Sequence, residues 1–157
     1  MTLPAPSLRH VCDLSIRVSA PTEAGHTQGL STRGMRRIIP IIGGTVRGAI
    51  NGTVLQAGAD FQMITSDTTA DLDARYILRL DDGSHVYVHN TALRRASADD
   101  VAKLIRGDPV DPTRVYFRCV PRFEVENPAL LWLTQSVFIG TATRAPDGVE
   151  LSIYEVM

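Results

Sequence analysis

Cysteine and lysine are scarce in this sequence. Two cysteines, Cys12 and Cys119, stand far apart among 157 residues, and Lys103 is the single lysine beside fifteen arginines. Two distant cysteines predict buried thiols in a reducing compartment and argue against a disulfide-stapled secreted scaffold. The excess of arginine fits a coding bias, although an arginine held inside a cavity would also bind a carboxylate well through two parallel hydrogen bonds.

Strong charge and long apolar runs are also missing. The formal net charge is -1, whereas nucleic-acid-binding domains usually present a strongly basic face. No stretch approaches the ~20 apolar residues that span a bilayer, and the N-terminus shows no secretory signal. We therefore expect a cytoplasmic protein whose partner is neither a nucleic acid nor a membrane. With 44% hydrophobic residues, the chain suits one domain over residues 1–157.

Alternation of apolar and polar residues predicts a chain made mostly of β-strands. Residues 8–18 alternate regularly, and the Asp-Gly pairs at 82–83 and 147–148 are typical of tight hairpins. Residues 19–35 are rich in Gly, Ser, Thr and Pro without any period, and we interpret them as a long loop, either a candidate lid or a disordered segment. The predicted strands are 8–18, 37–42, 45–55, 60–66, 71–80, 84–90, 116–124, 132–143 and 149–156.

One helix is predicted, at residues 98–106. Ser97 is suited to cap its start, Leu104 and Ile105 share a face with each other, and Gly107 follows its end. Strands at hairpin spacing with one helix predict an all-β fold, a single antiparallel β-barrel of about eight to ten strands with one short α-helix. A barrel is favoured over a sandwich because closure removes exposed edges and creates an interior.

Familiar cofactor, metal and nucleophile motifs are absent. Gly43, Gly44 and Gly48 lack the spacing of a dinucleotide fingerprint. His85 and His89 would lie ~13 Å apart along a strand that rises ~3.3 Å per residue, too far to share one metal ion. No serine lies in a GxSxG turn. We therefore expect neither a metal site nor a cofactor.

Polar residues inside the predicted strands are the most informative feature, because strands are depleted in Asp and Asn. A charged strand face is solvated roughly two times in three, since Asp, Glu and Arg are seldom buried unless paired. Here, however, the faces mix both charge signs with an aromatic or an amide nearby, as a polar cavity would. The sequence leaves both interpretations open. The residues are Asp60, Asp73, Arg75, Asn90, Arg118 and Glu124.

Several motifs together resemble the domain-of-unknown-function family 3237. They are RRIIPIIGGTVRGAINGTVL, GADFQ, DARYILRLDDGSHVYVHN, YFRCVPRFE, WLTQSVFIGTATR and VELSIYEV. The resemblance implies an intracellular antiparallel β-barrel of about this size, without a firmly assigned general activity. Thr91 and Thr134 stand where the family has Arg and Asn, which points to a changed substrate. The polar and aromatic positions that match the family are Asp60, Asp73, Arg75, Tyr76, Asn90, Arg118, Glu124 and Trp132.

The first functional hypothesis is an enzyme without a cofactor, of the lyase, isomerase or cyclase type, acting on a small carbonyl or carboxylate compound. A carboxylate, Asp60 first, would move the proton, and a closed barrel can desolvate it and raise its pKa toward neutrality. The alternative is that Asp60 is structural and caps the turn at residues 57–59 by bonding nearby backbone amides. Arginine would hold substrate charge, and an amide or phenol would stabilise an oxyanion. The predicted catalytic residues are Asp60, Asp73 and Glu124, and the predicted substrate-binding residues are Arg75, Tyr76, Asn90, Arg118 and Trp132.

Two other hypotheses stay open. The barrel could be a non-catalytic small-molecule binding protein, with its polar residues orienting an apolar or aromatic ligand. It could also be a structural homo-oligomer whose charged strand faces are solvated. The direction in which Asp60, Asp73, Arg75 and Arg118 point distinguishes these hypotheses.

Overall fold

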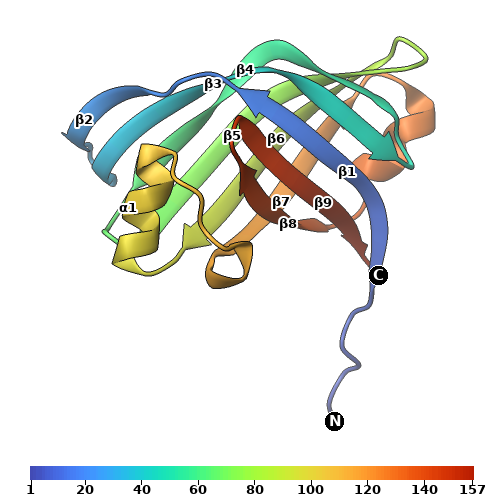
Figure 1. The fold of residues 1–157 in the computed structure, drawn as a ribbon. Helices are drawn as coiled ribbons and strands as arrows, with labels where there is room; N and C mark the ends of the chain where they lie inside the picture. Colours follow the sequence, from blue (N-terminus) through green and yellow to red (C-terminus); the bar gives the residue numbers. More distant parts are fainter.

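Eight strands close into an antiparallel barrel in the computed structural model, which describes residues 1–157 (Figure 1). The strands are β1 (Leu8–Val18), β2 (Thr22–Gln28), β3 (Arg33–Gly48), β4 (Gly52–Ile64), β5 (Thr69–Leu80), β6 (His85–Arg95), β7 (Tyr116–Val125), β8 (Phe138–Ala145) and β9 (Gly148–Val156). The helices are α1 (Ala98–Arg106) and two 3-10 helices, η1 (Pro112–Arg114) and η2 (Pro128–Thr134). The all-β barrel with one short α-helix that the sequence predicts is therefore confirmed.

The order of the strands explains the closure. Around the ring they run β1-β9-β8-β7-β6-β5-β4-β3, and β3 then pairs with β1 in a register that extends from Cys12↔Gly48 to Val18↔Ile41. The ninth strand, β2, lies outside this ring and pairs with β3 alone. A closed ring leaves no free edge among its eight strands and encloses an interior.

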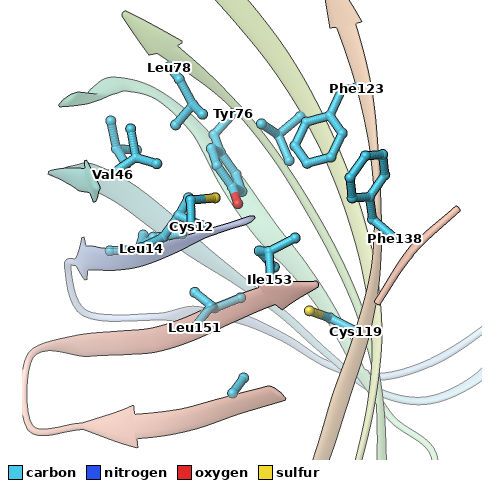
Figure 2. Close-up of a cluster of buried hydrophobic side chains, with 14 of the residues drawn as sticks. Cys12, Leu14, Val46, Tyr76, Leu78, Cys119, Phe123, Phe138, Leu151 and Ile153 are labelled. Atoms are coloured by element: carbon cyan, nitrogen blue, oxygen red, sulfur yellow. The ribbon is translucent and has the colours of Figure 1, made fainter. Parts of the chain in front are cut away.

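Inward-facing side chains from the strands of the ring fill most of this interior. Val46 of β3, Tyr76 and Leu78 of β5 and Ile153 of β9 belong to one buried cluster, part of which is drawn in Figure 2. Because successive side chains of a strand point to opposite faces, every second residue reaches this cluster. The core therefore follows directly from the alternation in the sequence.

Two strands, β2 and the start of β3, occupy most of the predicted loop at residues 19–35. β2 forms a hairpin with the first part of β3, in a register from Thr22↔Ile38 to Gln28↔Arg33. Six of the seven residues of β2 are exposed, so neither face of the strand needs apolar side chains. A strand that buries no face carries no hydrophobic alternation, which is why the sequence does not reveal it.

The boundaries of β3, β4 and β8 also differ from the prediction. The Gly43-Gly44 pair and Ala57-Gly58 do not end strands, because each lies in an irregular stretch inside a longer one. The turn between β3 and β4 falls at residues 49–51, within the segment 45–55 that the sequence predicts as one strand. The predicted strand 132–143 begins instead as the end of η2, and β8 starts only at Phe138.

Helix α1 has the predicted bounds and caps. The Ser97 side chain accepts a hydrogen bond of 3.2 Å from the backbone N–H of Asp100, and Gly107 ends the helix with φ 85°. Leu104 borders a small cavity together with Arg94 and Phe117, so α1 covers the end of the barrel where β6 finishes and β7 begins. None of the helices is both long and apolar enough to cross a membrane.

Candidate functional site

A small cavity lies inside the barrel and is lined by eighteen residues, twelve of them hydrophobic. Water-sized molecules can reach a volume of ≈ 60 Å³ in it. Its charged and amide-bearing lining consists of Asp60, Gln62, Asn90, Arg94 and Arg144. A mostly apolar cavity with a few converging polar groups is the usual form of a small-molecule site.

Strand register brings these polar groups together. Asp60 of β4 is paired with Ala74 of β5, and Ala74 is paired in turn with Asn90 of β6. These three residues form one row across the inner wall, and Ala92 lies two residues along β6 from Asn90. Both alanines line the cavity, and their short side chains leave space that a larger residue would fill.

The carboxyl group of Asp60 is the only acidic group in the lining. Gln62 Nε2 donates a hydrogen bond of 2.8 Å to its Oδ2, and the backbone N–H of Asp73 donates one of 3.2 Å to its Oδ1. Burial raises the pKa of Asp60, while the Gln62 hydrogen bond and the positive charge of Arg94 oppose that rise. Asp60 is therefore easier to protonate than a solvated aspartate, as proton transfer near neutral pH requires.

Two arginines face this carboxyl group from the β6 and β8 sides of the cavity. Arg94 is only 2% exposed, and its Nε has no hydrogen-bond partner. Burial lowers the pKa of Arg94 to about 10, and the nearby charge of Arg144 adds to the effect. Burial likewise lowers the pKa of the half-buried Arg144, and Arg37 on β3 contributes to this shift.

Tyr76 and Asn90 supply neutral polar groups. Figure 2 shows the Tyr76 ring projecting into the barrel interior, among side chains of β1 and β9. Burial raises the pKa of Tyr76, so its hydroxyl stays protonated and can donate a hydrogen bond. Asn90 Oδ1 is buried without a partner, so it is available to a ligand.

Four of the predicted site residues lie on the outer face of the barrel. Asp73 and Arg75 have the opposite parity on β5 to Ala74 and Tyr76, which line the cavity, so their side chains point outward. Arg118 and Glu124 are likewise exposed on β7. These four residues therefore do not join Asp60 in the cavity, and an outward position gives them no contact with a ligand inside it.

Asp73 and Arg75 are nevertheless paired on this outer face, as the sequence predicts. Arg75 donates hydrogen bonds of 3.2 and 3.3 Å to the Asp73 carboxylate, and His89 Nε2 lies 2.9 Å from Asp73 Oδ1. Arg118 donates to the Phe117 carbonyl at 2.9 Å. The charged face of β5 is thus a surface ion-pair network.

Trp132 lies at a different place in the barrel. It belongs to η2 and packs against Phe138, with their ring centroids 6.2 Å apart. Phe138 begins β8, whereas Arg144 lies near the end of that strand. Trp132 therefore supports the apolar core at the end of β8 opposite to the arginines, and it does not line the cavity.

Sequence reasoning missed Arg37, Gln62, Arg94 and Arg144. Arg94 has the same parity as Asn90 in one strand, so extending the predicted segment 84–90 by four residues would have placed it inside. Arg37 shares its parity with Ile39 and Ile41 in the same way. Arg144 follows the predicted segment 132–143 by one residue and shares its parity with the buried Ala142, so extending that segment would have placed it inside in the same way.

Comparison with known proteins places the chain among relatives of nearly equal length. The family model described as "Protein of unknown function (DUF3237)" matches residues 6–156. A UPF0311 protein of Bradyrhizobium diazoefficiens is 42% identical over 154 residues, which cover 98% of this chain and 99% of the relative.

Solved structures agree with this relationship. The crystal structure of a conserved protein of unknown function from Rhodopseudomonas palustris is 41% identical, with a TM-score of 0.90, and the match covers 99% of this chain and 100% of the other. An enzyme from Penicillium herquei is 16% identical with a TM-score of 0.70 over 100% of this chain and 98% of the other, a likeness of fold alone. On the family match and the identity to its relatives, the chain belongs to the DUF3237 family.

Proposed function

We propose that this protein is an enzyme that needs no cofactor and transfers a proton on a small carbonyl or carboxylate compound held inside the barrel. The observation that carries the proposal is the Asp60 carboxyl group, which lines an apolar cavity and has its pKa raised by burial. A carboxyl group in such a setting can take a proton from a carbon acid and return it.

Groups near Asp60 can stabilise the negative charge that such a reaction develops on the substrate. Removal of a proton beside a carbonyl leaves an enolate oxygen, which needs hydrogen-bond donors and positive charge. The Tyr76 hydroxyl and the Asn90 amide can supply donors, and Arg94 supplies the charge. Many lyase, isomerase and cyclase reactions include a step of this kind, so we assign the class of chemistry and no single reaction.

A non-catalytic binding protein is the second candidate. Its supporting observation is the lining of the cavity, in which twelve of eighteen residues are hydrophobic. A carrier of small apolar compounds would use the polar groups only to orient its ligand. The two candidates differ in whether the bound compound leaves the protein chemically changed.

The test is incubation with a library of small carbonyl and carboxylate metabolites. Native mass spectrometry identifies compounds that occupy the protein, and product analysis then shows whether they are converted. We expect conversion by the wild type, a rate about 10²–10⁴-fold lower in Asp60→Asn, and an unchanged rate in the outer-face control Arg122→Gln. Occupancy without conversion of any compound would instead establish the carrier.

A further inference from the structure

Positive charge exceeds negative charge at the cavity end covered by α1. Arg94 and Arg144 both line the cavity, and Asp60 is the only acidic residue that does so. One positive charge therefore stays uncompensated in the lining even when Asp60 is ionised, and two do when Asp60 is protonated. Burying a charge without a partner costs free energy, so these apolar surroundings favour the binding of an anion.

Buried donor atoms without partners lie in this lining and beside it. Arg94 Nε in the lining and Nη1 of the neighbouring Arg37 are buried and have no hydrogen-bond partner. Arg37 is paired with Gln62 across β3 and β4, and Gln62 donates to the Asp60 carboxylate. Buried donors are nearly always satisfied in folded proteins, so these atoms indicate a bound group that supplies acceptors.

Neighbouring groups in the protein compensate these arginines only in part. Glu23 reaches Arg37 from the half-exposed side of β2, with Oε1 3.4 Å from Nε. The Arg94 guanidinium carbon lies 5.9 Å from the centroid of the Phe117 ring, a cation–π contact. Such a contact uses no lone pair on the ring as a hydrogen-bond acceptor, so the guanidinium donors can still bind oxygen atoms.

We propose that Arg94 and Arg144 form an anion subsite, with Arg37 beside them, that binds the carboxylate group of a small substrate. This inference rests on the proposed function, because it supplies the substrate class for the same cavity. A carboxylate fits the planar fork of arginine, and its single charge matches the excess left when Asp60 is ionised. The small volume and the apolar lining call for a short organic body on that carboxylate.

The experiment measures anion binding without any need for turnover. Two-dimensional NMR of the arginine Nε–H groups follows Arg94 while acetate, propionate or benzoate is added at pH 7. Acetamide, propionamide and benzamide are matched neutral probes, and inorganic phosphate tests the other common oxyanion. The variant Arg144→Gln tests the subsite, and Arg122→Gln is the control on the outer face of the barrel. The NMR signal of Arg94 is followed in the wild type, so no variant of this buried residue is needed.

We expect saturable shifts of the Arg94 Nε–H signal with carboxylates and none with amides. Arg144→Gln should weaken binding at least about tenfold, since a hydrogen bond to a charged group is lost, while Arg122→Gln binds as the wild type does. Asp60→Asn should still bind the carboxylate, so a failure of proton transfer and a failure of this subsite are distinguishable. Absence of carboxylate binding, binding of phosphate alone, or unchanged affinity in Arg144→Gln would overturn the proposal.

Discussion

At the scale of single residues, strand parity decides which polar side chains reach the cavity. Asp60 and Asn90 are predicted site residues that line the cavity, whereas Asp73 and Arg75 have the outward parity on β5. A sequence shows parity within a strand but not which parity points inward, because both faces of β5 contain residues that a core or a surface could accept. The inward face is fixed only when the ring closes.

The raised pKa of Asp60 has a consequence for stability. Because burial raises this pKa, the folded protein holds the proton more tightly than the unfolded chain does. The resulting stability is complete below the unfolded pKa, ~3.9, and is lost as the pH rises through the folded value. We expect the free energy of unfolding of the wild type to fall relative to that of Asp60→Asn as the pH rises above about 4, by about 1.4 kcal/mol for each unit by which folding raises the pKa of Asp60.

Urea denaturation of both proteins across this pH range checks the expectation. In the Asp60→Asn variant, the new side-chain oxygen can keep the hydrogen bond from the Asp73 backbone. Gln62 Oε1, which has no partner in the wild type, can accept a hydrogen bond from the new amide group. A difference in unfolding free energy that stays flat as the pH rises would show that folding leaves the pKa of Asp60 unshifted, and one that grows in favour of the wild type would show that folding lowers it. Either result would contradict the expectation.

The outer network of Asp73 predicts a different outcome. Partial burial opposes the shift, but Arg75 and His89 together lower the pKa of Asp73. Its stabilising effect is therefore present above the unfolded pKa and lost as the pH falls through the folded one. Because the side chain is 37% exposed, Asp73→Asn should cost less than about 1 kcal/mol at pH 7.

The outward position of Asp73 also predicts how a variant of this residue binds ligands. Asp73→Asn should bind any compound that occupies the cavity with an affinity within about twofold of the wild type, because its side chain points away from the cavity. Isothermal titration calorimetry measures both proteins. A tenfold loss of affinity in Asp73→Asn would show that Asp73 contributes to ligand binding after all.

At the scale of elements, the sequence predicts those helices and strands that carry a regular local pattern, and it misplaces those that do not. The cap at Ser97 and the stop at Gly107 give α1 its bounds, since both act within one helical turn. The sequence does not predict β2, because its exposed side chains show no alternation of apolar and polar residues. The glycines inside β3 and β4 look like the ends of strands. A bulge and a turn demand the same residue type, so the sequence alone cannot separate them.

The bulge in β4 yields a prediction about the stability of a Gly58 variant. Gly58 has φ 141°, and a Cβ added there would lie 2.0 Å from the Arg75 carbonyl oxygen. Gly58→Ala should therefore lower the free energy of unfolding by about 2–3 kcal/mol. Gly83→Ala is the matched control: its φ is also positive, at 89°, but nothing lies within 4 Å, so only about 1 kcal/mol is expected. Equal losses in the two variants, measured by urea denaturation, would contradict a steric role for Gly58.

At the scale of the whole molecule, closure of the barrel is what turns scattered residues into a site. Asp60 of β4, Asn90 and Arg94 of β6 and Arg144 of β8 come from strands that are distant in the sequence, and they meet because eight strands form a ring. The sequence predicts the barrel class, since hairpin spacing is local. It does not predict the arginine cluster, because contacts across the interior depend on the register of every strand between them.

Hydrogen exchange between solvent and substrate tests the central claim, proton transfer by Asp60, most directly. Compounds that occupy the cavity are incubated in D₂O with wild type, Asp60→Asn or Arg122→Gln, and deuterium uptake at carbon is followed by NMR. We expect uptake beside a carbonyl group with the wild type and with Arg122→Gln, and a rate about 10²–10⁴-fold lower with Asp60→Asn. Equal uptake by Asp60→Asn and the wild type, or no uptake from any cavity-binding compound, would contradict it.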